Sequence, residues 1–564
     1  MIFKLMGNLF FRGRAINSRE NLAANSPVCL CMPVGSKWSE PEREIQMTHK
    51  LTHKMTHKII LNGEKFQLEE VVAIARQGVG VAISVGSEAR IQKARQLVDK
   101  WVKEGVRIYG VTTGFGALSD VTISLEDTKK LQRKILLSHS AGMGNNAADD
   151  VVRAMMALRI NDFCRGNSGL RLETIEKLAQ LLNSGIIPVV PEKGSVGASG
   201  DLVPMAHLSL VLIGEGEAFV DGVRMTGAKA LAKKGISPLE LEAGEGLALI
   251  NGTQFMIALG CLALHDALNL CKHADIAASM SLETLMGTRA AFDPRIHRAR
   301  PHIGQMKAAR NMLKMTENSG IISSHRDCSQ VQDAYTLRCS PQVHGASWDA
   351  FAYVDRVVRV EMNSSTENPL IFPESEEFIS GGNFHGQPLA LACDFLGIAI
   401  AELANISERR IERLVNPQLS GLPAFLVEDG GLNSGFMIAQ YAAASLVSEN
   451  KVLAHPASVD SIPTSANKED HVSMGAFAAR KCRNIVENTE EVIAIELLCG
   501  AQAIDLFTNF KAGDGTLAAY EVIRKKVDYR KEDRLLSTDI AKVKALLRDG
   551  SIVNAVEAAV GTLY

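Results

Sequence analysis

Apolar residues recur every three or four positions over much of this chain, which is the pattern of helices that bury one face. Clear examples occupy residues 126–139, 150–164 and 172–184. Further helices are expected over residues 254–273, 348–362, 387–415, 434–453 and 472–506. Several of these later segments are apolar on most faces and must be buried, so we predict a bundle of long helices at a subunit interface.

A few short segments have the composition of strands instead. They lie at residues 59–61, 107–108, 187–190 and 217–223. Aromatic residues make up only 5% of the chain while Ala and Leu are plentiful, which favours helices over a β-rich fold. The predicted fold class is therefore mainly α, with a long-helix bundle core and a smaller mixed N-terminal domain. We expect a mobile N-terminal extension over residues 1–54, the mixed domain over 55–250 and the bundle over 251–564.

The start of the chain differs from the rest because it shows no sustained periodicity. A four-residue unit repeats near the end of this part and places His49, His53 and His57 at the spacing of metal ligands on one face of a helix. A small tandem duplication in a mobile tail gives the same pattern. We favour the duplication and predict no metal site.

Charge and hydropathy argue against two classes of partner. The formal net charge is −2, so the chain has no basic field for nucleic acid. The apolar stretch closest to a membrane span, residues 255–270, is interrupted by His265 and Asp266 and is expected to be a core helix. The 10 Cys residues form no disulfide-like or zinc-like framework, which is typical of reduced thiols. We therefore predict a cytoplasmic protein with no nucleic-acid or membrane partner.

The most informative segment is the stretch Gly-Ser-Val-Gly-Ala-Ser-Gly-Asp-Leu at residues 194–202. It lacks the Gly-Lys-Ser/Thr of a phosphate loop, the Gly-x-Gly of a dinucleotide loop and the Gly-x-Ser-x-Gly of a serine hydrolase. Two interpretations remain for the segment taken alone. It is either a structural loop before a helix that Asp201 caps, or a place where the backbone itself reacts.

Such a reaction would begin with attack of the Gly200 amide nitrogen on the Ala198 carbonyl carbon, which closes a five-membered ring. Loss of that carbonyl oxygen as water, and of the Ser199 hydroxyl as a second water, gives a 4-methylidene-imidazol-5-one, a strong electrophile. The attacking residue must be Gly, because a Cβ would crowd the amide and forbid the compressed backbone. Ser199 supplies the methylidene carbon, and Ala198 is suitably small.

The same segment resembles the cofactor motif of the histidine and aromatic amino-acid ammonia-lyase family. Further motifs of that family occur in the family order, and the resemblance covers about residues 60–506. They are Tyr-Gly-Val-Thr-Thr-Gly-Phe-Gly at 109–116, similar to a lid loop, Asn-Gly-Thr-Gln at 251–254, Gln-Asp-Ala-Tyr-Thr-Leu-Arg-Cys at 332–339, similar to a substrate-binding helix, Glu-Asn-Pro-Leu at 367–370 and Gly-Gly-Asn-Phe-His-Gly at 381–386.

The resemblance implies an ammonia-lyase or fumarase-aspartase-like fold and a homotetramer whose active sites are each built from three subunits. The electrophile formed from Ala198, Ser199 and Gly200 would be the cofactor, with no external one. It would turn the α-amino group of the substrate into a leaving group, whereas in an alternative family mechanism the imidazole ring of the substrate attacks the methylidene instead.

The resemblance also assigns roles to single residues. Arg338 would clamp the substrate carboxylate as a bidentate partner. Asn251 and Gln332 would hydrogen-bond the carboxylate or the cofactor oxygens. Tyr335 and Phe384 would line the pocket beside the substrate ring.

Two residues compete for the role of the base that removes the β-proton. Tyr109 is the preferred base, provided that the site lowers its pKa, and Glu469 is the rival. The sequence leaves this choice open.

Two positions bear on which amino acid is deaminated. His139 matches a histidine that pairs with the substrate imidazole in histidine-specific relatives, although some tyrosine-specific relatives also carry His there. Glu469 matches a Glu of histidine-specific relatives where aromatic-specific relatives carry Gln, and a carboxylate suits an imidazole with its N–H donors. Each residue taken alone is more often structural or solvent-exposed.

Together these positions favour non-oxidative deamination of L-histidine to trans-urocanate and ammonia. A tyrosine or phenylalanine ammonia-lyase or aminomutase with the same cofactor is the alternative. A serine hydrolase that uses Ser199 is a distant one.

Removal of residues 1–54 should leave lyase activity unchanged, because a mobile extension contributes nothing to the core or the site. The truncated and full-length chains would be assayed side by side at equal content of folded protein, measured by circular dichroism. Loss of activity in a folded truncated chain would show that the extension is structural.

Overall fold

The computed structural model describes residues 58–114, 116, 123–326 and 331–564. The predicted extension, its three histidines and part of the lid-loop motif lie outside the described residues.

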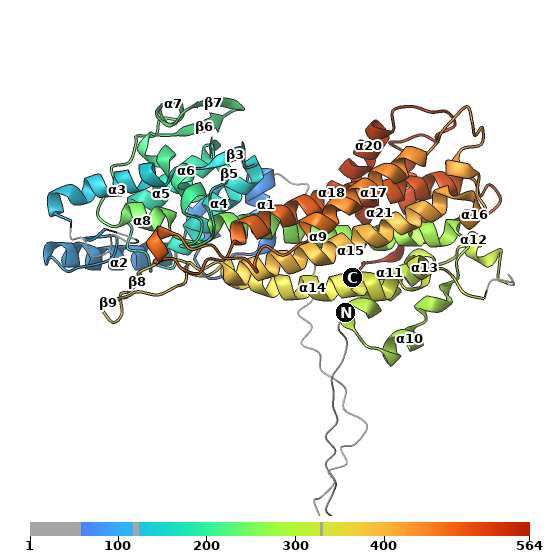
Figure 1. The fold of residues 1–564 in the computed structure, drawn as a ribbon, viewed down its shortest axis with the longest axis horizontal. Coiled ribbons are helices and arrows are strands. Elements are labelled where there is room, and N and C mark those ends of the chain that lie inside the picture. The colour runs from blue at the N-terminus through green and yellow to red at the C-terminus, as the bar shows by residue number, and fades with distance from the viewer. Residues whose placement is uncertain (1–57, 115, 117–122, 327–330) are drawn as a thin grey trace, which may run out of the picture. The chain divides into compact units, whose positions relative to one another are not determined.

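The first part of the described chain mixes short strands with helices (Figure 1). Its elements are β1 (Ile59–Leu61), α1 (Leu68–Gln77), β2 (Val81–Ile83), α2 (Val85–Lys103), α3 (Leu125–His139), β3 (Met143–Asn146), α4 (Asp149–Phe163), α5 (Leu172–Asn183), β4 (Ile186–Pro188), β5 (Pro191–Lys193), α6 (Leu202–Leu210), β6 (Glu217–Val220), β7 (Val223–Thr226), α7 (Gly227–Lys233) and α8 (Glu245–Ile250). β1 and β2 pair in parallel, β3 and β5 pair antiparallel, and β4, β6 and β7 form an antiparallel sheet in that order.

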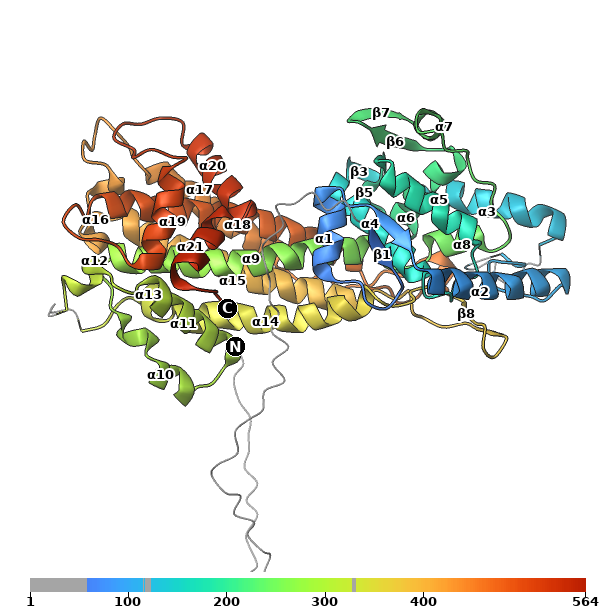
Figure 2. The ribbon, with the colours of Figure 1, turned by 180° about the vertical axis from the view of Figure 1, so that it is seen from behind.

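The rest of the chain is almost entirely helical. Its elements are α9 (Gln254–Thr284), α10 (Pro294–Ala299), α11 (Ile303–Met315), α12 (Gly320–Ser323), α13 (Tyr335–Arg338), α14 (Ser340–Glu361), β8 (Leu370–Phe372), β9 (Glu377–Ile379), α15 (Gln387–Val415), α16 (Pro417–Ser420), α17 (Met437–Leu453), α18 (Gly475–Asp505), α19 (Asp514–Arg524), α20 (Leu536–Arg548) and α21 (Ser551–Val560). The long helices α9, α14, α15 and α18 pack along one another and form the bundle seen in Figures 1 and 2.

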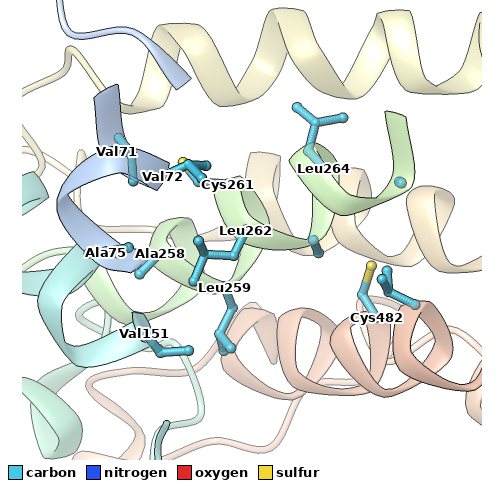
Figure 3. Packing of buried hydrophobic residues seen from close by; sticks show 14 of the residues in the cluster. Val71, Val72, Ala75, Val151, Ala258, Leu259, Cys261, Leu262, Leu264 and Cys482 are labelled. Carbon is cyan, nitrogen blue, oxygen red and sulfur yellow. The ribbon is translucent and has the colours of Figure 1, made fainter. Parts of the chain in front are cut away.

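The N-terminal half of α9 joins the bundle to the mixed part. Figure 3 shows Val71, Val72 and Ala75 of α1 and Val151 of α4 around Ala258, Leu259, Cys261, Leu262 and Leu264 of α9, with Cys482 of α18 nearby. These side chains belong to one buried cluster, and Cys261 and Cys482 are free thiols within it. The described residues form a single compact unit. The expected division near residue 250 stays a prediction.

The predicted fold class is confirmed, and most predicted helices are present. α15 has the predicted ends, whereas α9 continues past the predicted end at residue 273 to Thr284. The polar residues beyond the predicted end are buried and bond to distant partners. Asp275 contacts His344 at 2.7 Å, and Glu283 accepts a hydrogen bond from the Gly513 amide at 2.8 Å.

The strand predicted at residues 107–108 was wrong, because the chain turns there. The Ile108 amide donates to Thr112 Oγ1 at 2.9 Å, and Thr112 Oγ1 donates to the Val106 carbonyl at 2.7 Å. These side-chain bonds take the place of a strand partner.

Two described helices, α9 and α15, are long and apolar enough to cross a membrane by length and composition. About 78% and 67% of their most apolar windows are buried in the protein, so both are core helices of the bundle here.

The bundle also buries a network of charged side chains. Arg410 of α15 donates from Nε to Glu496 of α18 at 2.5 Å and from Nη2 at 2.9 Å, and both side chains are fully buried. Ser281 and Ser407 also donate to the Glu496 carboxylate. The network fixes the register of α9, α15 and α18 because each charged group has several bonding partners.

Glu496→Leu should lower the free energy of unfolding by roughly 3–5 kcal/mol, because it leaves Arg410 as a buried charge without its carboxylate. The exposed pair of Lys93 and Glu374, at 3.3 Å, offers a control, and Glu374→Gln should change stability by less than about 1 kcal/mol. Denaturant titration would compare the two variants. Equal stability of both would show that the buried pair adds nothing.

Candidate functional site

The Gly-rich loop lies between β5 and α6 and is pressed against the junction of α8 and α9. Gly200 has φ of +73°, and a Cβ on it would lie 2.1 Å from the Gly252 carbonyl oxygen. The amide of Asp201 donates to that same oxygen at 2.6 Å. No side chain fits at position 200, so the loop needs a glycine there.

A second segment holds the loop from the other side. The Met474 amide donates to the Val196 carbonyl at 2.9 Å, and Ser473 Oγ donates to the Gly197 carbonyl at 3.0 Å. Ser473 and Met474 immediately precede α18. The loop is therefore held between the N-terminal ends of α9 and α18.

Ser199 links these two supports to a carboxylate. Its hydroxyl donates to Glu469 Oε1 at 3.0 Å, and its carbonyl accepts a hydrogen bond from Asn251 Nδ2 at 3.0 Å. Thr464 Oγ1 donates to the other oxygen of Glu469 at 2.7 Å, and backbone bonds close the loop between residues 464 and 469. The carboxylate is thus oriented toward Ser199.

These residues border a cavity of about 480 Å³. It is lined by Tyr109, Gly116, His139, Ser199, Leu202, Leu247, Asn251, Asn368, Phe384, Ser465, Lys468 and Glu469. Ala198 and Gly200 flank Ser199 and are buried. The chain therefore brings together most of the site residues predicted from the sequence, and the volume suits a small molecule.

Tyr109 contacts the cavity from the lid-loop motif. Its hydroxyl accepts a hydrogen bond from the Gly116 amide at 2.9 Å. Burial raises the pKa of Tyr109 and the charge of Glu469 raises it further, while the Gly116 amide opposes the rise. This is the opposite of the lowered pKa that a base at this position requires.

His139 occupies the last position of α3 and faces the same cavity. Its Nδ1 lies 2.9 Å from the Ile135 carbonyl oxygen, and a carbonyl only accepts, so Nδ1 carries the proton. Burial lowers the pKa of His139, which favours the neutral ring. A neutral ring with Nδ1 protonated has Nε2 as an acceptor.

Three predicted residues, Gln332, Tyr335 and Arg338, lie elsewhere. α13 sits at the end of the bundle opposite α6 and α8 (Figures 1 and 2). The Thr288 amide, just past the C-terminal end of α9, donates to Asp333 at 2.8 Å, whereas Asn251 precedes the N-terminal end of α9. α9 has 31 residues and is therefore about 46 Å long. One chain cannot place these residues and Ser199 in one cavity.

Sequence reasoning missed a buried cluster beneath the loop. It contains Arg159 and Asp162 of α4, Gln254 of α9, and Thr366 and Glu367. The signal was available, because Arg159 and Asp162 are charged residues within the apolar pattern of α4. Lys468 was also missed, although it lies beside Glu469 and lines the cavity.

The interpretation of the segment as a structural loop predicted that Asp201 caps α6. The Asp201 side chain makes no such capping hydrogen bond. Its carboxylate accepts hydrogen bonds from the Met256 amide at 2.8 Å and from Ser195 Oγ at 3.1 Å. Burial raises the pKa of Asp201 to about 7, although these hydrogen bonds oppose the rise. Asp201 thus joins the loop to α9.

A bundle of long helices that holds an Ala-Ser-Gly loop close against Gly252, with a tyrosine and a carboxylate around one cavity, is the arrangement of the ammonia-lyase class. Comparison with known proteins agrees. The family model for aromatic amino acid lyases matches residues 66–525. A curated histidine ammonia-lyase from Alkaliphilus oremlandii is 55% identical over 502 residues, which cover 89% of this chain and 99% of that protein.

Solved structures give the same result. Histidine ammonia-lyase from Trypanosoma cruzi superposes with a TM-score of 0.84 at 44% identity, over 89% of this chain and 96% of that one. Tyrosine aminomutase from Streptomyces globisporus superposes with a TM-score of 0.85 at 38% identity, over 90% and 100%. The chain belongs to the aromatic amino acid lyase family.

Proposed function

We propose that this chain catalyses the non-oxidative deamination of L-histidine to trans-urocanate and ammonia. The observation that carries the proposal is that His139 and Glu469 face the same cavity as Ser199. The names of the relatives at about 55% identity agree with this substrate.

The two residues offer complementary groups to an imidazole ring. The Glu469 carboxylate accepts from an N–H donor, and His139 Nε2 accepts as well when Nδ1 is protonated. A phenyl ring has no N–H group and could donate a hydrogen bond to neither residue.

The electrophile is proposed to form from Ala198, Ser199 and Gly200. The residues fit this group, because Gly252 occupies the space that a Cβ at position 200 would take and Asn251 donates to the Ser199 carbonyl. The group would supply the electrophilic carbon that takes up the substrate amine. No external cofactor is required.

The chain's own residues then orient the substrate and move one proton. Arg338 would hold the substrate carboxylate in a bidentate pair, with Gln332 beside it. Tyr335 and Phe384 would pack near the ring. Tyr109 is the proposed β-proton base, and a cation near its hydroxyl would lower the raised pKa found within one chain. Glu469 remains the rival base.

These roles require more than one copy of the chain. Gln332 and Tyr335 are solvent-exposed in the single chain, and Tyr335 is 71% exposed. The large apolar side chains Leu391, Phe395 and Ile398 of α15 are also exposed. We propose a homotetramer with active sites shared between subunits, located in the cytoplasm.

The direct test is an assay of the purified protein with L-histidine, which follows urocanate absorbance, with L-tyrosine and L-phenylalanine run in parallel. Turnover of histidine alone supports the proposed substrate. Turnover of tyrosine or phenylalanine instead would agree with the proposed cofactor but would refute the roles of His139 and Glu469 in substrate recognition.

Ser199→Ala should abolish both turnover and the near-UV absorbance of the electrophile, because the methylidene carbon comes from the serine side chain. Circular dichroism should match the unmodified protein. Ser375→Ala, in the exposed turn between β8 and β9, is the control and should keep both properties. Activity in the Ser199 variant would rule out the proposed cofactor.

Glu469→Gln should lower kcat/KM for histidine by about 10²-fold or more, because it removes a charged acceptor near the reacting groups. Asp470→Asn changes the exposed neighbouring carboxylate and should leave kcat/KM unchanged. Unaltered kcat/KM in the Glu469 variant would remove this residue from substrate recognition and catalysis.

A further inference from the structure

Arg159 is a fully buried arginine beneath the Gly-rich loop. Its Nη2 donates to the carbonyl oxygens of Ala248, in α8, and of Asn251, the latter at 2.9 Å. Its Nη1 donates to Gln254 Oε1 at 3.1 Å. One guanidinium thus joins the last turn of α8, the connecting residues and the first residue of α9.

Carboxylates and an aromatic ring fix the orientation of this guanidinium. Asp162 Oδ2 accepts from Nη1 at 2.8 Å, and Glu367 Oε1 lies 3.6 Å from Nη2. The Phe163 ring centroid is 4.3 Å from the guanidinium carbon. Asp162 Oδ2 also accepts from Gln254 Nε2 at 3.0 Å and from Thr366 Oγ1 at 2.9 Å. The guanidinium is therefore held in one place by side chains from three segments.

The backbone that Arg159 holds is the backbone that touches the loop. Gly252 presents its carbonyl oxygen to Gly200 and accepts from the Asp201 amide at 2.6 Å. Asn251 Nδ2 donates to the Ser199 carbonyl at 3.0 Å. These contacts lie on either side of the nitrogen that would attack, so a shift of residues 251–252 changes the conformation of the tripeptide.

We infer that Arg159 is a positioning residue for closure of the Ala198-Ser199-Gly200 ring, acting through the backbone of Asn251 and Gly252. The inference rests on the proposed cofactor. In closure the Gly200 nitrogen bonds to the Ala198 carbonyl carbon, whose oxygen leaves as water with the two amide protons. The Ser199 α-proton and hydroxyl then leave as a second water, so no oxidant or co-reactant is needed.

Lysine cannot replace Arg159 in this role. The planar fork reaches the Ala248 and Asn251 carbonyls through Nη2 and the Gln254 amide oxygen through Nη1, whereas an ammonium is a single point of charge on a flexible stem. Arg159→Lys therefore keeps the positive charge beside Asp162 but cannot make the same set of hydrogen bonds to the carbonyls and to Gln254.

The test measures ring closure directly in the full-length protein. Intact mass reports the loss of two water molecules, near-UV absorbance reports the ring, and circular dichroism reports folding. Folded Arg159→Lys should close the ring about 10²-fold more slowly than the unmodified chain, as expected for a misplacement on the order of 1 Å. The freshly purified variant should thus contain mainly the open tripeptide.

Arg410→Lys is the matched control. Arg410 is also fully buried and also pairs with a carboxylate, but it lies in the C-terminal part of α15, close to α13 and far from the loop of its own chain. Its variant should contain the closed ring in full. An open ring in both variants would mean that general loss of stability stops closure, and would overturn the role of Arg159.

Other results of the same measurements would overturn the role of Arg159 or refute the cofactor. A closed ring in folded Arg159→Lys overturns the inference while leaving the cofactor intact, and no mass loss in the unmodified protein refutes the cofactor itself. If Arg159→Lys does not fold, the triple variant Arg159→Met, Asp162→Leu and Glu367→Gln removes all three buried charged groups together and avoids an unpaired charge. An open ring in the folded triple variant supports the inference, and a closed ring overturns it.

Discussion

The contact between Gly200 and Gly252 is the constraint on which the site depends. A backbone carbonyl presses against an α-carbon that has no side chain, so both segments keep this approach only because residue 200 is glycine. The Asp201 amide bonds to the same carbonyl, which makes the contact directional as well as close. Neither segment is part of a helix, and their positions follow from the helices that they connect.

α9 and α18, whose N-terminal ends hold the loop, belong to the bundle, so the packing of the bundle fixes the position of the loop. Residues 251–253 separate α8 from α9, and Ser473 and Met474 precede α18. The two long helices pack against each other, and α1 and α4 cover the N-terminal half of α9 with a continuous apolar cluster (Figure 3). A reactive backbone needs such a support, because strain persists only where the surroundings hold it in place.

Much of the fold and of the candidate site could be predicted from the sequence, because helical periodicity and short motifs are local features of the chain. Helical periodicity located α15 at its observed ends, and the Gly-rich loop, Asn251 and Glu469 stand in recognisable motifs. The end of α9 was missed because buried polar residues such as Asp275 look like surface residues until their partner is known. Arg159 was missed although a charged residue within the apolar pattern of α4 was a visible signal, because its bonding partners are carbonyl groups far from it in the chain.

The electrostatics of the cavity support the proposal that the active site is shared between copies of the chain. Within the chain, Tyr109 faces the Glu469 carboxylate, and both this charge and burial disfavour the phenolate. Arg338, the cation assigned to the substrate, stands at the other end of α9, beside the exposed Tyr335 ring at 4.4 Å. In the proposed homotetramer, an Arg338 from another copy would bring a cation to this cavity and oppose the effect of Glu469 on Tyr109.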